Sequence, residues 1–270
     1  MPAATTKRES LDDVQSQQNF RGPAIQSVGV TNIRYPFTFR SADTTQPTVG
    51  TWNLFVSLAG DKRGTHMSRF MEVLSELDEV LTVESLMETC EQIRSRLVAD
   101  DASMSLEFPW FIEKSAPVSG VKGKLDIDVQ IEISRGSSNE CTLTLKVPAT
   151  SLCPCSKQIS DFGAHNQRCE LTASIRFTDG QTISLEELYR IVEETASAPV
   201  YSVIKREDEK WVTEQAWENP KFVEDTVRDL AEALHRDSRI RWYRCSAENF
   251  ESIHNHDAYA RIERDKAVNN

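Results

Sequence analysis

Residues 125–147, LDIDVQIEISRGSSNECTLTLKV, carry the clearest structural signal in the chain. Apolar side chains occupy every second position from Leu125 to Ile133 and again from Cys141 to Val147, with polar side chains between them. This period of two is typical of β-strands that bury one face. The short SSN segment between the two runs supplies turn residues, so the stretch predicts an antiparallel hairpin.

The same alternation recurs outside this hairpin and predicts five further strands, at residues 50–58, 103–113, 169–177, 239–247 and 257–263. Helical spacing of apolar residues or an N-terminal capping signal predicts four helices, at 67–80, at 83–97, after Ser184 with Glu187, and after Asn219-Pro220. In each half of the chain the order is strands, two helices, strands. The sequence therefore predicts an α+β fold, in which helices cover one face of antiparallel sheets.

The repeated order also indicates duplication of one α+β unit, although no close sequence repeat is visible. We place the boundary between the halves in residues 113–123, which contain Pro, Ser and Gly. Residues 1–27 are polar with little apolar periodicity, and we interpret them as a mobile N-terminal arm.

Composition excludes several classes of function. A net charge of −11 over 270 residues argues against a nucleic-acid binder and against adhesion to anionic membranes. The chain contains no run of about 18 apolar residues, so we expect no transmembrane helix. The first residues also lack the apolar region of a secretory signal. We therefore expect a cytoplasmic protein, whose six cysteines are free thiols or metal ligands rather than disulfides.

Residues 151–168, SLCPCSKQISDFGAHNQR, gather potential ligands in one polar segment. Cys153 follows a predicted strand and His165 precedes the next, so a hairpin-like return would bring a thiolate and an imidazole together. Zinc accepts this ligand pair readily, and a third protein ligand would have to come from elsewhere. The alternative is that Cys153 and Cys155 are two buried small residues. A redox pair is less favoured, because the usual redox motif is CxxC and this segment has CxC. A zinc finger is also less favoured, because it needs four soft ligands and the other nearby cysteines, Cys141 and Cys169, fit strand interiors.

An acidic stretch at 205–225 offers carboxylates for such a site. Glu224 falls in the first turns of a predicted helix, where its carboxylate can face a ligand. Glu207 or Glu209, in the preceding predicted loop, would complete a metal site. The alternative is an ordinary solvated acidic surface.

Two further clusters have side chains suited to catalysis or binding. In ENFESIHNHDAYA (248–260), His254 and His256 lie near Glu251, and two histidines beside a glutamate suit acid–base chemistry near neutral pH. A metal-free polar loop is the alternative. In KRGTHMSR (62–69), basic residues precede a helix and would bind phosphate, unless they form an ordinary charged loop; the cluster contains Lys62, Arg63, His66 and Arg69.

Together, the segments SLCPCSKQIS, GAHNQR, 205–225, 248–260 and GTHMSRF closely resemble the GTP cyclohydrolase I family of type IB, and the resemblance runs from about residue 28 to 263. It implies conversion of GTP and water to 7,8-dihydroneopterin triphosphate and formate, the entry to folate biosynthesis. It also implies two tandem tunnelling-fold units, here at 28–118 and 119–270. The expected assembly is a homotetramer with active sites at subunit interfaces.

The resemblance also implies roles for individual residues. The metal ligands would be Cys153, His165 and Glu209, with Glu207 as a rival for Glu209, and the metal would be zinc, manganese or iron. Other active-site residues fall into three sets: Glu224 as anchor of the guanine base, Glu251, His254 and His256 as catalytic groups, and Lys62, Arg63, His66, Arg69 and Arg168 as substrate-binding residues. Two alternatives are a tunnelling-fold protein that binds a metal or nucleotide without turnover, and a related pterin or deazapurine enzyme.

Overall fold

A computed structural model describes residues 22–267 of the chain, in which nine strands and six helices form an α+β structure. Most of the predicted N-terminal arm, residues 1–21, lies outside the described residues. The strands are β1 (Ile25–Ser41), β2 (Thr44–Leu58), β3 (Ala102–Ser115), β4 (Lys122–Arg135), β5 (Glu140–Leu152), β6 (Asn166–Phe177), β7 (Ala198–Pro199), β8 (Ile240–Asn249) and β9 (Ala258–Asp265). The helices are α1 (Met67–Ser75), α2 (Val83–Arg96), α3 (Pro154–Ile159), α4 (Leu185–Glu193), α5 (Arg206–Glu218) and α6 (Val223–Arg236).

All nine strands belong to one antiparallel sheet in the order β1-β2-β3-β4-β5-β6-β8-β9, with the short β7 paired to β5. The hairpin predicted from residues 125–147 is confirmed as β4 and β5. Val129 pairs with Leu145, Leu145 with Ala173 of β6, and Ala173 with Cys245 of β8. Paired residues in an antiparallel sheet point to the same face, so the alternating apolar residues form one continuous buried surface.

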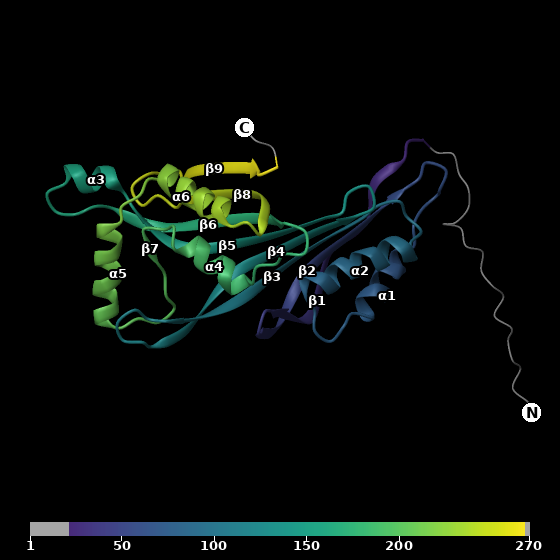
Figure 1. Ribbon diagram of the computed structural model, residues 1–270, viewed down its shortest axis with the longest axis horizontal. Helices are drawn as coiled ribbons and strands as arrows, with labels where there is room; N and C mark the ends of the chain where they lie inside the picture. Colours follow the sequence, from purple (N-terminus) through teal and green to yellow (C-terminus); the bar gives the residue numbers. More distant parts are fainter. Residues whose placement is uncertain (1–21, 268–270) are drawn as a thin grey trace, which may run out of the picture.

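Four helices, α1, α2, α4 and α6, cover this apolar face. One fully buried side chain from each, Phe70, Leu86, Leu188 and Leu230, belongs to the same hydrophobic core as the strand residues. Figure 1 shows the molecule as elongated, with α1 and α2 toward one end and α3 and α5 at the other. The prediction that helices pack on one face of an antiparallel sheet is confirmed for these four helices.

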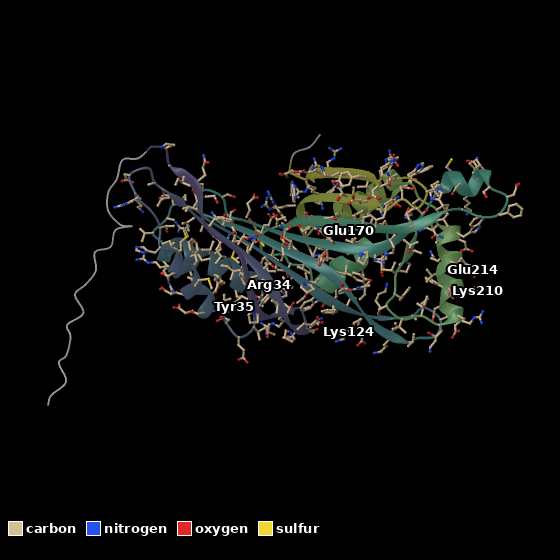
Figure 2. All side chains as sticks on the ribbon, turned by 180° about the vertical axis from the view of Figure 1, so that it is seen from behind. Arg34, Tyr35, Lys124, Glu170, Lys210 and Glu214 are labelled. Atoms are coloured by element: carbon tan, nitrogen blue, oxygen red, sulfur yellow. The ribbon has the colours of Figure 1, made fainter. Side chains whose placement is uncertain are left out.

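The opposite face of the sheet is polar. Glu107, Asp128 and Lys146 lie on neighbouring strands and line a hollow of about 730 Å³ together with Arg34, which is labelled in Figure 2. Alternation of apolar and polar residues along β3, β4 and β5 therefore separates the hydrophobic core from a face that carries charged side chains.

Two helix predictions were wrong in detail. Residues 206–218, expected as a loop, form α5, although their apolar periodicity is weak. Asn219 does not begin the next helix; it ends α5, and its Nδ2 donates to the carbonyls of Ala196 and Ser197. The next helix, α6, begins at Val223 with Phe222 as its N-cap. Long-range hydrogen bonds to the chain near β7 thus override the local capping preference of Asn219.

Strand β1 was not predicted, because bulges between Ile25 and Val28 and between Val30 and Ile33 interrupt its period. None of the helices between residues 22 and 267 combines the length and hydrophobicity that crossing a bilayer requires.

We expect Leu145→Ala to lower the free energy of unfolding by about 2–5 kcal/mol, because Leu145 is fully buried between β4 and β6 and truncation leaves a cavity. Lys146→Ala, one residue further on the exposed polar face, is the control and should change it by less than about 0.5 kcal/mol. Urea unfolding followed by circular dichroism measures both values, and equal losses in the two variants would contradict the assignment of faces.

Candidate active site

Cys153 and His165 lie opposite each other where β5 and β6 leave the sheet. Pairing of β5 with β6 ends at Leu152 and Asn166. In the next pair of residues, Cys153 N–H donates a hydrogen bond of 3.1 Å to the His165 carbonyl. The hairpin-like return predicted for this segment is therefore confirmed. The eleven intervening residues, 154–164, form α3 and a largely exposed loop.

Cys153 is the N-cap of α3, and its Sγ accepts a hydrogen bond from Ser156 N–H at 3.4 Å. Ser156 also binds the other side of the return, because His165 N–H donates to Ser156 Oγ at 3.2 Å. Pro154 at the first helical position fixes the turn. These contacts hold the backbones of Cys153 and His165 together.

The His165 ring is oriented by a buried amide. His165 Nδ1 lies 3.0 Å from Gln167 Oε1, and the Gln167 side chain is only 8% exposed. Metal-binding histidines commonly use one ring nitrogen for the metal and the other for a hydrogen bond of this kind. The chemistry of Cys153 and His165 therefore fits a thiophilic divalent metal.

The remaining cysteines have other environments. Burial raises the pKa of Cys90, Cys169 and Cys245 to about 12 and that of Cys141 to about 11, so these four stay protonated thiols. All six cysteines are free, as predicted. Cys155 is exposed on α3, and Cys153 is only partly buried. The reading of Cys153 and Cys155 as two buried small residues is therefore wrong.

A polar layer closes the core directly beneath Cys153 and His165. The inward-facing positions of β5, β6 and β8 end in Ser151, Gln167 and Asn249, all buried. Asn249 Nδ2 donates to Ser151 Oγ at 3.1 Å, while Asn249 Oδ1 and Glu251 Oε2 are buried and receive no hydrogen bond from the described residues. Buried acceptors of this kind normally bind water or a ligand donor, so this end of the sheet is prepared for a polar ligand.

The predicted catalytic residues Glu251, His254 and His256 follow β8 at the same end. Phe250 N–H donates to the Arg168 carbonyl at 3.0 Å, which attaches their loop to the start of β6. The two histidines are exposed, and their rings stack with centroids 5.1 Å apart. His254 and His256 lie in a bend between β8 and β9.

Glu224 is also brought to this end of the sheet. It lies exposed in the first turn of α6, as predicted. Lys221 N–H donates to the Leu152 carbonyl at 3.1 Å, so the segment before α6 is tied to the residue that precedes Cys153.

Glu209 lies in the first turn of α5, away from Cys153. Helix α5 meets α3 near its other end, where Lys157 donates to the Trp217 carbonyl and its Nζ lies 4.6 Å from the Trp217 ring centroid. Eight residues of helix separate Glu209 from Trp217, which is about 12 Å along the axis. Figure 2 shows the same direction, since Lys210 lies further from α3 than Glu214. Glu207 and Glu209 are two apart and point to different sides of α5.

Consequently, residues 22–267 of this chain do not bring the three predicted metal ligands together. Within residues 22–267, no three His, Cys, Asp or Glu side chains lie close enough together to hold a metal ion. Cys153 and His165 fit such an ion, but a third protein ligand is not supplied in this arrangement of residues 22–267.

The predicted phosphate-binding cluster is also distant from Cys153. Lys62 Nζ donates to the Val98 carbonyl and Arg69 to the Arg96 carbonyl, next to the end of α2. With Arg63 and His66, they lie around the start of α1, at the opposite end of the molecule from α3 (Figure 1). Of the predicted substrate-binding cations, only Arg168 lies beside the Cys153–His165 return.

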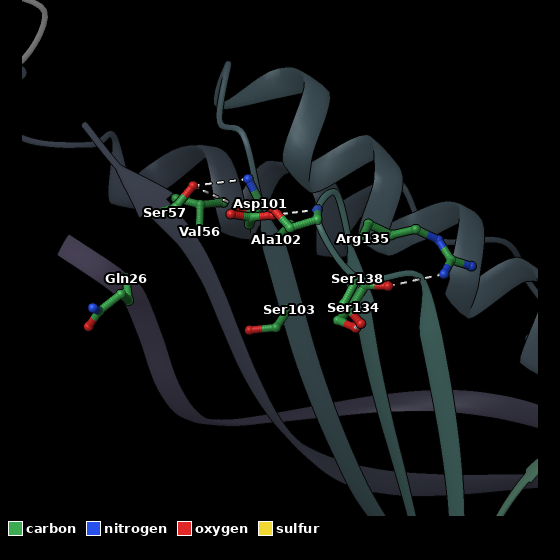
Figure 3. Close-up of a pocket in the computed structure, with 10 residues that line it drawn as sticks. Gln26, Val56, Ser57, Asp101, Ala102, Ser103, Ser134, Arg135 and Ser138 are labelled. Atoms are coloured by element: carbon green, nitrogen blue, oxygen red, sulfur yellow. Dashed lines mark hydrogen bonds between the residues drawn. The ribbon is translucent and has the colours of Figure 1, made fainter. Parts of the chain in front are cut away.

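A cavity of about 240 Å³ lies between β2, β3 and β4 (Figure 3) and is lined by none of the predicted site residues. Its polar groups bind one another: Asp101 N–H donates to Ser57 Oγ at 2.9 Å, and Ser137 N–H donates to Asp101 Oδ1 at 2.7 Å. We interpret these contacts as structural.

Ser151, Gln167 and Asn249 were not predicted from the sequence. The available signal was a polar residue at the inward position of an otherwise apolar alternation, as in Gln167 before Cys169 and Leu171. Asp208 was not predicted either: its neighbours Glu207 and Glu209 are exposed, while Asp208 itself is fully buried.

Asp208 fastens the start of α5 to the β3–β4 turn. Its carboxylate accepts hydrogen bonds from the N–H groups of Val118, Ser119 and Lys205 and from Ser119 Oγ. Burial by itself would raise the pKa of Asp208, but these four hydrogen bonds outweigh it and hold the pKa well below its usual range. The position of Glu209 thus depends on a charged, buried neighbour.

Comparison with known proteins identifies relatives over most of the chain. Residues 11–260 match a family described as type I GTP cyclohydrolase folE2. A protein named GTP cyclohydrolase FolE2 from Magnetococcus marinus is 49% identical over 255 residues, which cover 94% of this chain and 96% of that protein. Its namesake from Burkholderia ambifaria (strain MC40-6) is 50% identical over 258 residues, covering 95% of both chains.

Solved structures show a likeness in fold alone. Urate oxidase from Bacillus subtilis 168 superimposes with a TM-score of 0.51 at 8% identity, covering 90% of this chain and 99% of that chain. Urate oxidase from Bacillus sp. TB-90 gives a TM-score of 0.50 at 9% identity, covering 89% of this chain and 100% of that chain.

Asp208→Asn should destabilise the protein at pH 7 and change its acid sensitivity. The folded pKa of Asp208 is below the unfolded value of about 3.9, so the charged carboxylate stabilises the fold above that pH, and the contribution is lost as pH falls further. We therefore expect a lower melting temperature for Asp208→Asn at pH 7 and a smaller difference from wild type below about pH 4. Glu214→Gln on exposed α5 is the control; a constant difference at all pH values would refute the charge-based explanation.

Proposed function

The chain belongs to the type I GTP cyclohydrolase family, and we propose that its reaction takes place where Cys153, His165, Glu224 and the Glu251–His256 loop meet. The protein is a GTP cyclohydrolase I, a hydrolase that converts GTP and water to 7,8-dihydroneopterin triphosphate and formate at the first step of folate biosynthesis. The observation that supports this location is the Cys153–His165 return above a buried layer with unsatisfied acceptors.

Cys153 and His165 would hold a divalent metal, with Glu209 as the proposed third ligand. Such a metal would act as a Lewis acid and lower the pKa of coordinated water towards about 7. The ligand chemistry favours zinc, while manganese and iron are accepted by related sites. Because Glu209 is about 12 Å along α5 from the contact with α3, metal binding or subunit assembly has to bring it to the other two ligands.

His254 and His256 are the proposed proton-transfer groups. Ring opening, formate release and ring closure each move protons between nitrogen, carbon and oxygen atoms of the substrate. Two exposed imidazoles in one bend can donate and accept such protons near neutral pH.

Glu224 is the proposed anchor for guanine. Its carboxylate can accept two hydrogen bonds, from the N1–H and exocyclic amine of the base, and its place in the first turn of α6 favours negative charge. Adenine offers no such donor pair, so a site built around Glu224 would discriminate against ATP.

We also propose a homotetramer in which neighbouring subunits share active sites. The basic cluster at Lys62–Arg69 lies at the far end from Cys153, so it can reach a triphosphate there only from another subunit. Exposed apolar side chains surround the site, including Phe162 at 100% and Ile159 at 76% exposure. Such side chains on a single chain are typical of protein–protein contacts.

Two tandem tunnelling-fold units are our proposed description of the protomer. Strands β1–β4 with α1 and α2 have the order ββααββ, and β5, β6, β8 and β9 with α4 and α6 repeat it. From this order we propose a division between β4 and β5, whereas the boundary predicted from the sequence is at residues 118/119. A cytoplasmic location, without nucleic-acid or membrane partners, stays a prediction.

Cys153→Ala should abolish metal binding and lower GTP turnover by at least about 100-fold while the fold survives, because one metal ligand is lost from a loop outside the core. Metal content, circular dichroism and fluorescence of the oxidised pterin product measure the three effects. Cys155→Ala, two residues away on exposed α3, is the matched control and should retain metal and activity. Full turnover by metal-loaded Cys153→Ala would exclude the ligand role.

Glu224→Gln should raise KM for GTP about 10–100-fold with metal content unchanged, because hydrogen bonds to a charged acceptor contribute about 1.5–3 kcal/mol. Discrimination between GTP and ATP, measured as the ratio of kcat/KM, should fall in parallel. The control is Glu232→Gln, on the exposed side of the same helix. An unchanged GTP/ATP ratio in Glu224→Gln would argue against base anchoring.

A further inference from the structure

We propose that Gln167 is a positioning residue that fixes the tautomer of His165, so that the Nε2 lone pair of the imidazole is presented to the metal. The inference rests on the proposed metal site and extends it to a residue outside the ligand set. It begins from the 3.0 Å separation between His165 Nδ1 and Gln167 Oε1.

An amide oxygen can only accept a hydrogen bond, so the partner nitrogen of His165 must carry the proton. In a neutral imidazole, protonation at Nδ1 leaves Nε2 unprotonated, with its lone pair in the ring plane. Gln167 therefore selects the one neutral form of His165 that can bind a metal through Nε2.

Both ends of this hydrogen bond are held by backbone contacts. His165 donates its N–H to Ser156 Oγ at 3.2 Å and accepts from Cys153 N–H at 3.1 Å. Gln167 is on β6, where its backbone pairs with Ser151, and its side chain is only 8% exposed. The imidazole and the amide are thus held by the chain's own contacts, so less ordering is required on metal binding.

The location of Gln167 is difficult to explain by packing alone. It occupies the inward position that Cys169, Leu171 and Ala173 fill further along β6, where an apolar side chain would cover the end of the core. A buried amide is costly unless it makes hydrogen bonds, so a polar residue here requires a polar partner. His165 is that partner.

The opposite amide orientation has the opposite consequence. If Gln167 presented its NH₂ group, Nδ1 would accept the hydrogen bond and the proton would lie on Nε2, where it would block the metal. The two arrangements are therefore distinguishable by locating one proton in the metal-free protein.

Nuclear magnetic resonance of the metal-free full-length protein, with ¹⁵N-labelled histidine, is the first test. Resonances of His165 are assigned by comparison with His165→Gln. In wild type at a pH where the ring is neutral, we expect the proton on Nδ1 and an unprotonated Nε2. In Gln167→Met, which has similar length but no acceptor, the population should shift towards Nε2–H. A wild-type ring protonated on Nε2, or the same tautomer in both proteins, overturns the inference.

Titration of the metal-free proteins with Co²⁺, followed through thiolate charge-transfer absorption, is the second test. Gln167→Met should bind Co²⁺ about 10–100-fold more weakly than wild type. Gln167→Glu retains an acceptor for Nδ1–H and should restore affinity to within a few-fold of wild type. Gln130→Met, on the polar face of β4 where Gln130 contacts Glu107, is the control.

The outcomes separate the two proposals. If wild type binds no Co²⁺ through Cys153, the metal site proposed above fails, while the tautomer measurement still decides the role of Gln167. If wild type binds Co²⁺ and Gln167→Met binds it equally well, the positioning role is wrong and the metal site stands. Equal weakening in Gln167→Met and Gln167→Glu, with lowered melting temperatures, would also overturn it in favour of a purely structural residue.

Discussion

The register of β5, β6 and β8 is the constraint on which the rest of the structure depends. Each strand alternates apolar and polar side chains, and a shift by one residue would move every apolar side chain to the polar face. The observed pairing of Leu145 with Ala173 and of Ala173 with Cys245 keeps the apolar set under the helices. The same pairing places Ser151 opposite Gln167 and Asn249 opposite Cys169, and Asn249 reaches Ser151 through a side-chain hydrogen bond, so the three polar residues form one layer.

That layer connects the core to the chemistry. Ser151, Gln167 and Asn249 are polar where the core would otherwise continue, and Cys153 and His165 lie directly beyond them. The sheet thus supports Cys153 and His165 directly beyond its strand ends, while Glu224 in the first turn of α6 and His254 and His256 in the bend after β8 lie at the same end. Groups next to strand ends are held more firmly than groups in exposed segments.

The elongated shape has consequences for assembly. The basic residues near α1 and the thiol–imidazole pair near α3 lie at opposite ends of one sheet, and Glu209 is held near the β3–β4 turn by Asp208. Within residues 22–267, these components of the proposed nucleotide site therefore lie far apart. In the proposed homotetramer, a neighbouring subunit would contribute the missing groups at the Cys153 end, where apolar side chains are exposed.

The sequence by itself determined the local features of this protein. Strict alternation in 125–147 specified two strands and their turn, and the spacing of Cys153 and His165 around turn-forming residues specified a return that places them opposite each other. These features follow from short-range geometry. Helix α5, the burial of Asp208 and the polar layer were decided by tertiary structure, because they depend on contacts between residues up to 98 positions apart, as between Ser151 and Asn249. No local period encodes such a pairing, since the partner of a buried polar group is chosen by the sheet register and not by its sequence neighbours.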